Sequence, residues 1–115
     1  VHFQPIVEGM RAAVTESFGT SRGVAVPGIE VCGKTGTAQN AGVDHSIFMC
    51  FAPKENPQIA LLVFIENGGF GATWAVPMAS LLLEQYLKGD IAPNRKWMET
   101  RLLNANLMEV EPEQK

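Results

Sequence analysis

Cysteine, histidine and charged residues are scarce in this sequence, and each scarcity excludes a class of function. The two cysteines, Cys32 and Cys50, do not have the CxxC spacing of a structural zinc site, and only two histidines could complete one. We therefore expect neither a metal ion nor a cofactor. Charged residues make up 18% of the chain and the net charge is -3, with no block of like charges, so nucleic acid is not an expected partner.

Long apolar segments and targeting signals are also missing. The longest apolar run, residues 59–65, is too short to cross a bilayer, and no signal peptide is visible. Because the chain begins at Val1 rather than at a methionine, we expect an excised segment. In that case the missing signals say nothing about the parent protein.

The sequence is, in contrast, rich in hydrophobic residues. Apolar residues make up 46% of its 115 residues, which is enough for the core of one domain or of a piece of one. Cys32 and Cys50 both lie in apolar, strand-like runs, so we interpret them as small buried side chains. A disulfide between neighbouring strands stays open as an alternative, because its geometry cannot be judged from sequence.

Three short segments have the composition of β-strands and are separated by turn residues. They are residues 31–39, 45–52 and 58–66. The third contains the longest apolar run, which does not alternate with polar residues and therefore predicts a strand covered on both faces. Because the connections are short, we expect three consecutive antiparallel neighbours, a β-meander.

Apolar residues at helical spacing flank these strands on both sides. We expect helices over about residues 5–17 and 74–88, packed on the sheet, with Gly89 ending the second helix. Gly9 costs the first helix on the order of 1 kcal/mol relative to alanine, so we expect a close helix contact at that point. A short third helix with Asn94 as its N-cap is expected next, followed by a mobile tail from Glu109. The predicted fold class is α+β.

The most informative stretch is the glycine-punctuated strand around Lys34. Gly33 and Gly36 remove side chains on either side of Lys34, so that another backbone or a ligand can come close. Lys34 supplies a point charge, Thr35 and Thr37 supply hydroxyl donors, and an exposed strand edge adds main-chain donors. This set suits a ligand with a carboxylate, or an extended peptide. The alternative is a strand whose lysine merely reaches solvent, because a bare Lys-Thr-Gly triplet is common.

Residues 34–40, Lys-Thr-Gly-Thr-Ala-Gln-Asn, are the fullest of five signatures that occur in a fixed order. The other four are Gly9-Met10, Phe51-Ala52-Pro53, Asn56-Pro57 and Glu66-Asn67-Gly68-Gly69. Together they resemble the C-terminal part of a penicillin-binding protein transpeptidase domain, in particular the class B family of penicillin-binding protein 2, the elongation-type D,D-transpeptidases. The resemblance covers about residues 3–90. It implies a partial transpeptidase fold over residues 1–90 and a C-terminal extension over residues 91–115.

The resemblance also implies an activity and a set of roles. The family transfers the D-Ala-D-Ala end of a peptidoglycan stem peptide through a serine, and β-lactams acylate that serine because they mimic the peptide. Lys34 would hold the substrate carboxylate and polarise the hydroxyl of the family's second motif, and Thr35 and Thr37 would hydrogen-bond the carboxylate. The backbone N–H of Thr37 would be an oxyanion donor, and Gly36 would let the acyl group lie against the strand. The implied setting is the periplasmic face of the bacterial inner membrane, with cell-wall elongation partners.

The chain departs from the family pattern in its serines. None of its four serines is followed by lysine three positions later or by asparagine two positions later; they are Ser17, Ser21, Ser46 and Ser80. We expect the nucleophile, its lysine and the middle motif to lie upstream in the parent, and no activity from this chain alone. Without that half, the piece should expose apolar surface and strand edges, which predicts self-association or strand exchange between copies.

Two other functions remain open at this stage. One is another serine enzyme that recognises β-lactams, such as a β-lactamase or a D,D-carboxypeptidase. The other is a non-catalytic module that binds a peptide carboxylate. His45 could lie at the mouth of the site beside the strand, although a polar residue that starts a strand is the favoured interpretation. Trp74 and Phe70 could line a substrate groove, although packing is the favoured role.

Overall fold

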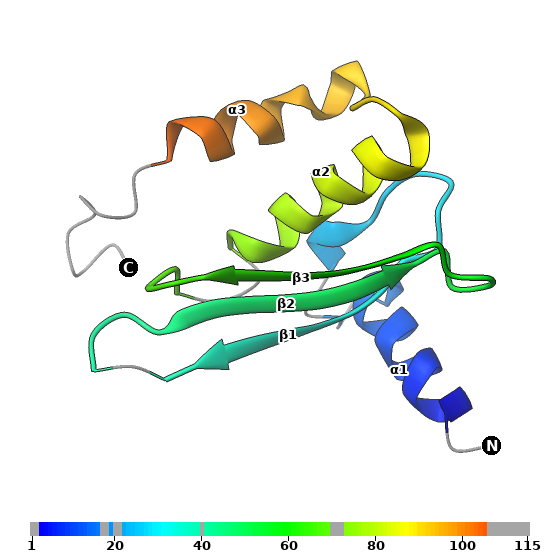
Figure 1. The fold of residues 1–115 in the computed structure, drawn as a ribbon, viewed down its shortest axis with the longest axis horizontal. Coiled ribbons are helices and arrows are strands. Elements are labelled where there is room, and N and C mark those ends of the chain that lie inside the picture. Colours follow the sequence, from blue (N-terminus) through cyan, green and yellow to red (C-terminus); the bar gives the residue numbers. More distant parts are fainter. Residues whose placement is uncertain (1–2, 17–18, 20–21, 40, 70–72, 106–115) are drawn as a thin grey trace.

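The computed structural model describes residues 3–16, 19, 22–39, 41–69 and 73–105. Their elements are, in order, α1 (Phe3–Thr15), η1 (Arg22–Val24), β1 (Cys32–Ala38), β2 (His45–Ala52), β3 (Ile59–Ile65), α2 (Ala75–Lys88), η2 (Pro93–Arg95) and α3 (Lys96–Asn104), where η marks a 3-10 helix. Figure 1 shows α2 lying along the sheet, α3 outside α2, and α1 at one end of the strands. The predicted α+β class is confirmed. The tail from Glu109 lies outside the described residues.

The three strands form one antiparallel sheet in the order β1-β2-β3, which confirms the predicted β-meander. In the register of the sheet, Lys34 of β1 lies opposite Met49 of β2, and Met49 lies opposite Leu62 of β3. Residues that lie opposite each other in neighbouring strands point to the same face of a sheet. The register therefore decides which side chains share the face of Lys34.

The core lies between one face of the sheet and the helices. Alternate residues of β2 are buried there, among them Phe48 and Cys50, as is Val63 of β3. Helix α2 covers this face and ends at Gly89, whose left-handed backbone (φ 83°) lets its N–H donate to the carbonyl oxygen of Gln85, as predicted. The core cluster consists of Val14, Val24, Val26, Val31, Phe48, Cys50, Ala52, Val63, Ala75, Val76, Ala79 and Leu83.

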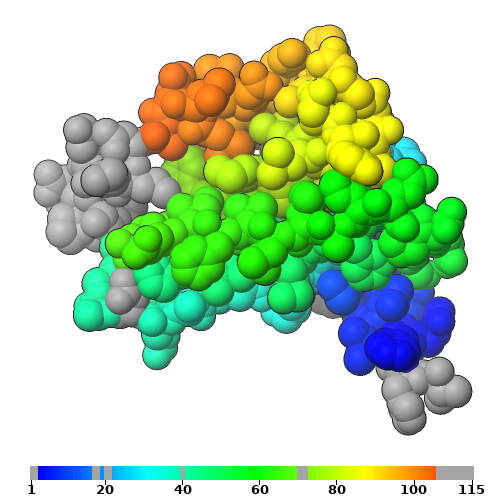
Figure 2. Space-filling view, in the orientation of Figure 1, coloured from blue at the N-terminus to red at the C-terminus, as the bar shows by residue number. Residues whose placement is uncertain are grey.

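The prediction that β3 is covered on both faces is wrong. Val63 is buried, but its neighbours Leu62 and Phe64 are 62% and 52% exposed. The reason is that β3 is an edge strand of the described sheet and the helices contact it from the core face only. Figure 2 shows β3 and the turn after it, in green, uncovered across the middle of the molecule. We call the face that carries Lys34, Met49, Leu62 and Phe64 the open face of the sheet.

Two helix predictions are also wrong in detail. A Cβ atom built on Gly9 meets nothing within 4 Å, so no close helix contact surrounds this exposed residue. Asn94 is not the N-cap of α3, because it lies inside η2 and the 3-10 helix continues directly into α3, with Arg95 at the cap position. The first helix runs over Phe3–Thr15, two residues earlier at each end than predicted, where helix ends are least certain from sequence.

Both cysteines are buried and free, as the interpretation of small buried side chains predicted. Cys50 lies opposite Gly33, and Cys32 lies opposite Phe51. Cys32 and Cys50 are therefore offset by one position in the register, which turns their side chains to opposite faces of the sheet and excludes a disulfide between them. Burial raises the pKa of the Cys50 thiol to about 11, so it stays protonated near neutral pH.

Among the helices of the described residues, none has the length and the hydrophobicity that a bilayer crossing requires. Within the same ranges, no three histidine, cysteine or acidic side chains come together as a metal site would require.

Candidate functional site

Lys34 lies on β1, at one edge of the described sheet, with its side chain exposed. Its Nζ donates a hydrogen bond to the carbonyl oxygen of Thr35 at 2.9 Å. Thr37 is exposed and Thr35 is half-buried. The charge and both threonines thus lie on an edge strand of the described sheet. Lys34 turns to the open face, whereas Thr35 and Thr37, opposite buried Phe48 and Ser46, turn to the other face.

The two glycines of this strand, Gly33 and Gly36, differ in the space that surrounds them. A Cβ atom on Gly33 would lie 2.4 Å from Cζ of Phe48, so the packing of this phenylalanine against the strand requires glycine at position 33. A Cβ atom on Gly36 would make only an ordinary contact with Ile47, at 3.7 Å, and its backbone is not in the left-handed region. The fold therefore requires Gly33, whereas the packing of the described chain leaves room for a side chain at position 36.

Two connections meet beyond the end of β1. His45, the first residue of β2, lies opposite Ala38, and its Nδ1 accepts a hydrogen bond from the backbone N–H of Asn67 at 2.9 Å. The N–H of Gly69 donates to the carbonyl oxygen of Asp44 at 2.8 Å. These two bonds tie the connection between β1 and β2 to the one between β3 and α2. His45 is thus a polar residue that starts a strand, as favoured, but it also has a specific partner.

Helix α1 is fastened near the start of β1 by charged side chains. Glu8 pairs with Lys54, in the turn between β2 and β3, and with Arg11 at 3.0 Å. The hydrogen bond from Lys54, followed by that from Arg11, holds the pKa of the Glu8 carboxyl below its usual value. The backbone N–H of Lys54 also donates to the carbonyl oxygen of Glu30, two residues before β1. These contacts fix where the chain enters the strand of Lys34.

A buried polar cluster was missed by the sequence analysis. Arg95 donates to Oε1 of Glu84 at 2.6 Å, to the carbonyl oxygen of Ala25 at 3.2 Å, and to Oγ of Ser80. Glu84 and Arg95 are only 1% and 8% exposed. Arg95 comes from the predicted extension of residues 91–115 and packs into the part before it. Ser80 and Glu84 follow buried Val76 at intervals of four, so their place on the buried face of α2 was the available signal.

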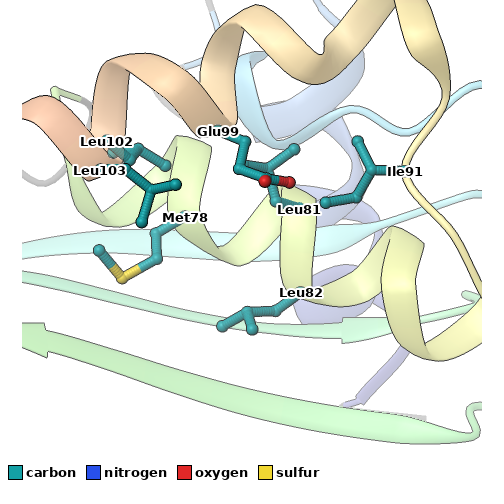
Figure 3. A pocket seen from close by; sticks show the side chains of 7 residues that line it. All are labelled: Met78, Leu81, Leu82, Ile91, Glu99, Leu102 and Leu103. Carbon is teal, nitrogen blue, oxygen red and sulfur yellow. The ribbon is translucent and has the colours of Figure 1, made fainter.

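An apolar groove of about 310 Å³ separates α2 from α3 (Figure 3). It is lined by Met78, Leu81, Leu82, Ile91, Glu99, Leu102 and Leu103. None of the predicted site residues lines it, so the groove is separate from the edge that carries Lys34. Trp74, at the start of α2, packs beneath the guanidinium of Arg101, whose carbon lies 4.4 Å from the ring centre. Phe70 lies outside the described residues.

Comparison with known proteins decides the family. The model of the penicillin binding protein transpeptidase domain matches residues 1–84 of this chain. The chain belongs to the penicillin-binding protein transpeptidase family. Relatives of the penicillin-binding protein 2 type are among its matches, which confirms the resemblance drawn from the five signatures.

One relative of this transpeptidase segment is the peptidoglycan D,D-transpeptidase MrdA of Acinetobacter baumannii. It is 32% identical over an alignment of 119 positions, which covers 85% of this chain and 18% of the relative. The segment therefore spans less than a fifth of that protein.

Solved structures of the family share the fold. Penicillin-binding protein 2 of Pseudomonas aeruginosa, in complex with WCK 5153, is 34% identical, with a TM-score of 0.65 over 77% of this chain and 20% of that one. Penicillin-binding protein 2 of Helicobacter pylori, in complex with MreC, is 26% identical, with a TM-score of 0.62 over 75% of this chain and 17% of that one. The α+β arrangement of the transpeptidase segment is therefore that of its relatives.

Proposed function

We propose that the protein containing this chain is a peptidoglycan D,D-transpeptidase, and that this chain supplies the Lys-Thr-Gly wall of its active site. The observation that carries the proposal is the exposure of Lys34 and Thr37 on an edge strand of a transpeptidase-family segment. An edge strand can receive an extended peptide, and the lysine can receive its terminal carboxylate.

Each residue of the wall has a role in the proposed reaction. Lys34, Thr35 and Thr37 hold the carboxylate of the terminal D-Ala. A serine from outside this chain attacks the carbonyl carbon of the preceding D-Ala, and the backbone N–H of Thr37 stabilises the oxyanion that forms. Collapse of this intermediate releases the terminal D-Ala and leaves an acyl-serine, which the amine of a second stem peptide then attacks. Gly36 leaves room for the acyl chain against the strand.

Covalent labelling tests this function. The full-length protein is expected to react with a fluorescent penicillin and to keep the label after denaturation, because an acyl-serine is a covalent bond. Residues 1–115 alone are expected to stay unlabelled, since they contain no Ser-x-x-Lys sequence. An unlabelled full-length protein would favour a non-catalytic module that binds peptide carboxylates. Rapid loss of the label by hydrolysis would favour a β-lactamase or a carboxypeptidase.

The setting and partners follow from the same proposal. A relative has been solved with MreC, and the family acts in cell-wall synthesis. We place the whole protein at the periplasmic face of the inner membrane, with the peptidoglycan stem peptide and β-lactams as ligands and cell-wall elongation proteins as partners. The upstream part of the same domain would cover the open face of the sheet.

Self-association of the separated chain is expected for the same reason. Met49, Leu62 and Phe64 expose apolar surface on the open face, and β1 and β3 are edges of the described sheet. Such edges pair readily with other chains. Light scattering of residues 1–115 should show a mass that rises with concentration, and Leu62→Lys should reduce the rise. A constant monomer mass at all concentrations would contradict this expectation.

A further inference from the structure

The apolar groove between α2 and α3 contains one charged side chain, that of Glu99. Every other residue that lines the groove is apolar. Figure 3 shows the carboxylate of Glu99, on α3, turned across the groove toward Leu81 and Ile91. Glu99 is half-buried, and no described residue forms an ion pair or a hydrogen bond with its carboxylate. The groove therefore combines an apolar lining with a single unpaired negative charge.

The chain holds this groove open by fixing α3 near both of its ends. At the start of α3, Arg95 pairs with buried Glu84 at 2.6 Å. In the last turn, the guanidinium of Arg101 lies 4.4 Å from the ring centre of Trp74. Both arginines are thus engaged with α2 and its start, and neither pairs with Glu99. A surface that is already formed loses little conformational freedom when it binds a partner.

The size and the exposure of the groove suit the side chains of another helix. Leu82 of α2 and Leu103 of α3 both line it and are 48% and 76% exposed. Its volume of about 310 Å³ is near the lower end of the range of ligand pockets, about 300 to 1,000 Å³. An amphipathic helix that lies on a groove of this kind inserts apolar side chains spaced at i, i+4 and i+7.

Glu99 determines the chemistry of the partner. Anything that covers the groove removes this carboxylate from water, which is costly unless a cation pairs with it. A purely apolar partner would leave the carboxylate unpaired, and an anionic lipid surface would repel it. The net charge of the chain, -3, also favours a cationic partner.

One wall of the groove lies outside the matched transpeptidase domain. The family model ends at residue 84, whereas Ile91, Glu99, Leu102 and Leu103 come after it. Completing the shared domain does not require a surface that is built partly by this extension. The position of the groove therefore favours a separate protein as its partner over the upstream part of the same domain.

We propose that the groove between α2 and α3 binds an amphipathic helix of a partner protein. Leucine-like side chains of that helix enter the groove, and a lysine or arginine on the same face pairs with Glu99. This interaction does not depend on the proposed transpeptidase reaction, because the groove is separate from the edge that carries Lys34.

Binding of synthetic helical peptides to the full-length protein tests the proposal. The peptides have about 16 residues, with leucines at i, i+4 and i+7 and with arginine, glutamine or glutamate at i+3. The arginine peptide should bind about 10-fold more tightly than the glutamine peptide, because a hydrogen bond between two charged groups is worth at least this factor. The glutamate peptide should bind most weakly. In Glu99→Arg the order should reverse. Isothermal titration calorimetry measures the dissociation constants.

Leu103→Lys and Trp97→Lys are the matched protein variants. Both replace an exposed apolar residue of α3 by lysine, but only Leu103 lines the groove. Leu103→Lys is expected to weaken binding of the arginine peptide about 10-fold, because it removes an apolar contact and adds a like charge. Trp97→Lys should leave the affinity unchanged. Melting temperatures identify any loss caused by unfolding.

Several outcomes would overturn the proposal. If the full-length protein binds none of the peptides saturably, the groove is not a docking site for a separate helix. Equal affinities for the arginine and glutamate peptides would show that Glu99 does not select the partner. Equal weakening by Leu103→Lys and Trp97→Lys would place the binding outside the groove.

Discussion

Replacing Gly36 by alanine in the full-length protein is expected to slow acylation by penicillin about 100-fold while leaving stability intact. The added methyl group meets only Ile47, at 3.7 Å, so the fold accepts it. It stands, however, on the stretch of the open face against which the acyl group is proposed to lie. Displacing a bound reactant by about 1 Å can cost about 100-fold in rate. Labelling rates and the midpoint of urea unfolding measure the two effects separately.

Gly33→Ala is the matched comparison. Unlike Gly36→Ala, it is expected to lower the free energy of unfolding. Its methyl group would overlap the ring of buried Phe48, at 2.4 Å. Overpacking of this kind destabilises a domain by about 1 to 3 kcal/mol. The free energy of unfolding should therefore fall for Gly33→Ala and stay equal or rise slightly for Gly36→Ala. If Gly36→Ala labels at the wild-type rate, the acyl group does not lie against this part of β1.

Removing the Arg95 side chain is expected to destabilise the transpeptidase domain by about 3 to 5 kcal/mol, because Glu84 would remain buried without its partner. Glu84 is 1% exposed, and Arg95 supplies its 2.6 Å hydrogen bond. The same substitution leaves the carbonyl oxygen of Ala25, in the segment that leads into β1, with the hydrogen bond from Oγ of Ser80 and without that from Arg95. Urea unfolding of Arg95→Ala in the full-length protein measures the loss.

A triple variant tells whether the loss comes from an uncompensated charge. Ser80→Ala, Glu84→Leu and Arg95→Met together remove every side-chain polar group of the cluster. Replacing a buried ion pair by apolar residues of similar size is often neutral or stabilising by about 1 to 4 kcal/mol. The triple variant should therefore be markedly more stable than Arg95→Ala. Equal destabilisation of the two variants would show that packing at position 95, and not the charge of Glu84, sets the effect.

Local patterns were sufficient to predict most of the fold. The turn residues between the strands predicted the β-meander, and the apolar stripe ending at Gly89 predicted α2, because both features depend on backbone preferences and spacing within a few residues. The ordered signatures around Lys34 were sufficient for the family. The exposure of Lys34 on an edge strand agrees with a site at that place, while the roles assigned to Lys34, Thr35, Gly36 and Thr37 stay predictions.

Burial, in contrast, could not be obtained from composition. The apolar run of β3 predicted a strand covered on both faces, but Leu62 and Phe64 are exposed because nothing in the described chain covers this part of the open face. The Arg95 cluster escaped notice because its members come from α2, from the segment after it and from the loop before β1. Only folding brings such distant groups together.

The sequence by itself determined the order of the elements, the Lys-Thr-Gly strand and the family, because these depend on residues that are close together in the chain. The tertiary structure alone distinguished Gly33 from Gly36, paired His45 with the backbone N–H of Asn67 and revealed the ion pair of Glu84 with Arg95. Each of these depends on atoms from separate strands or helices, whose distances are fixed only when the sheet and helices have packed.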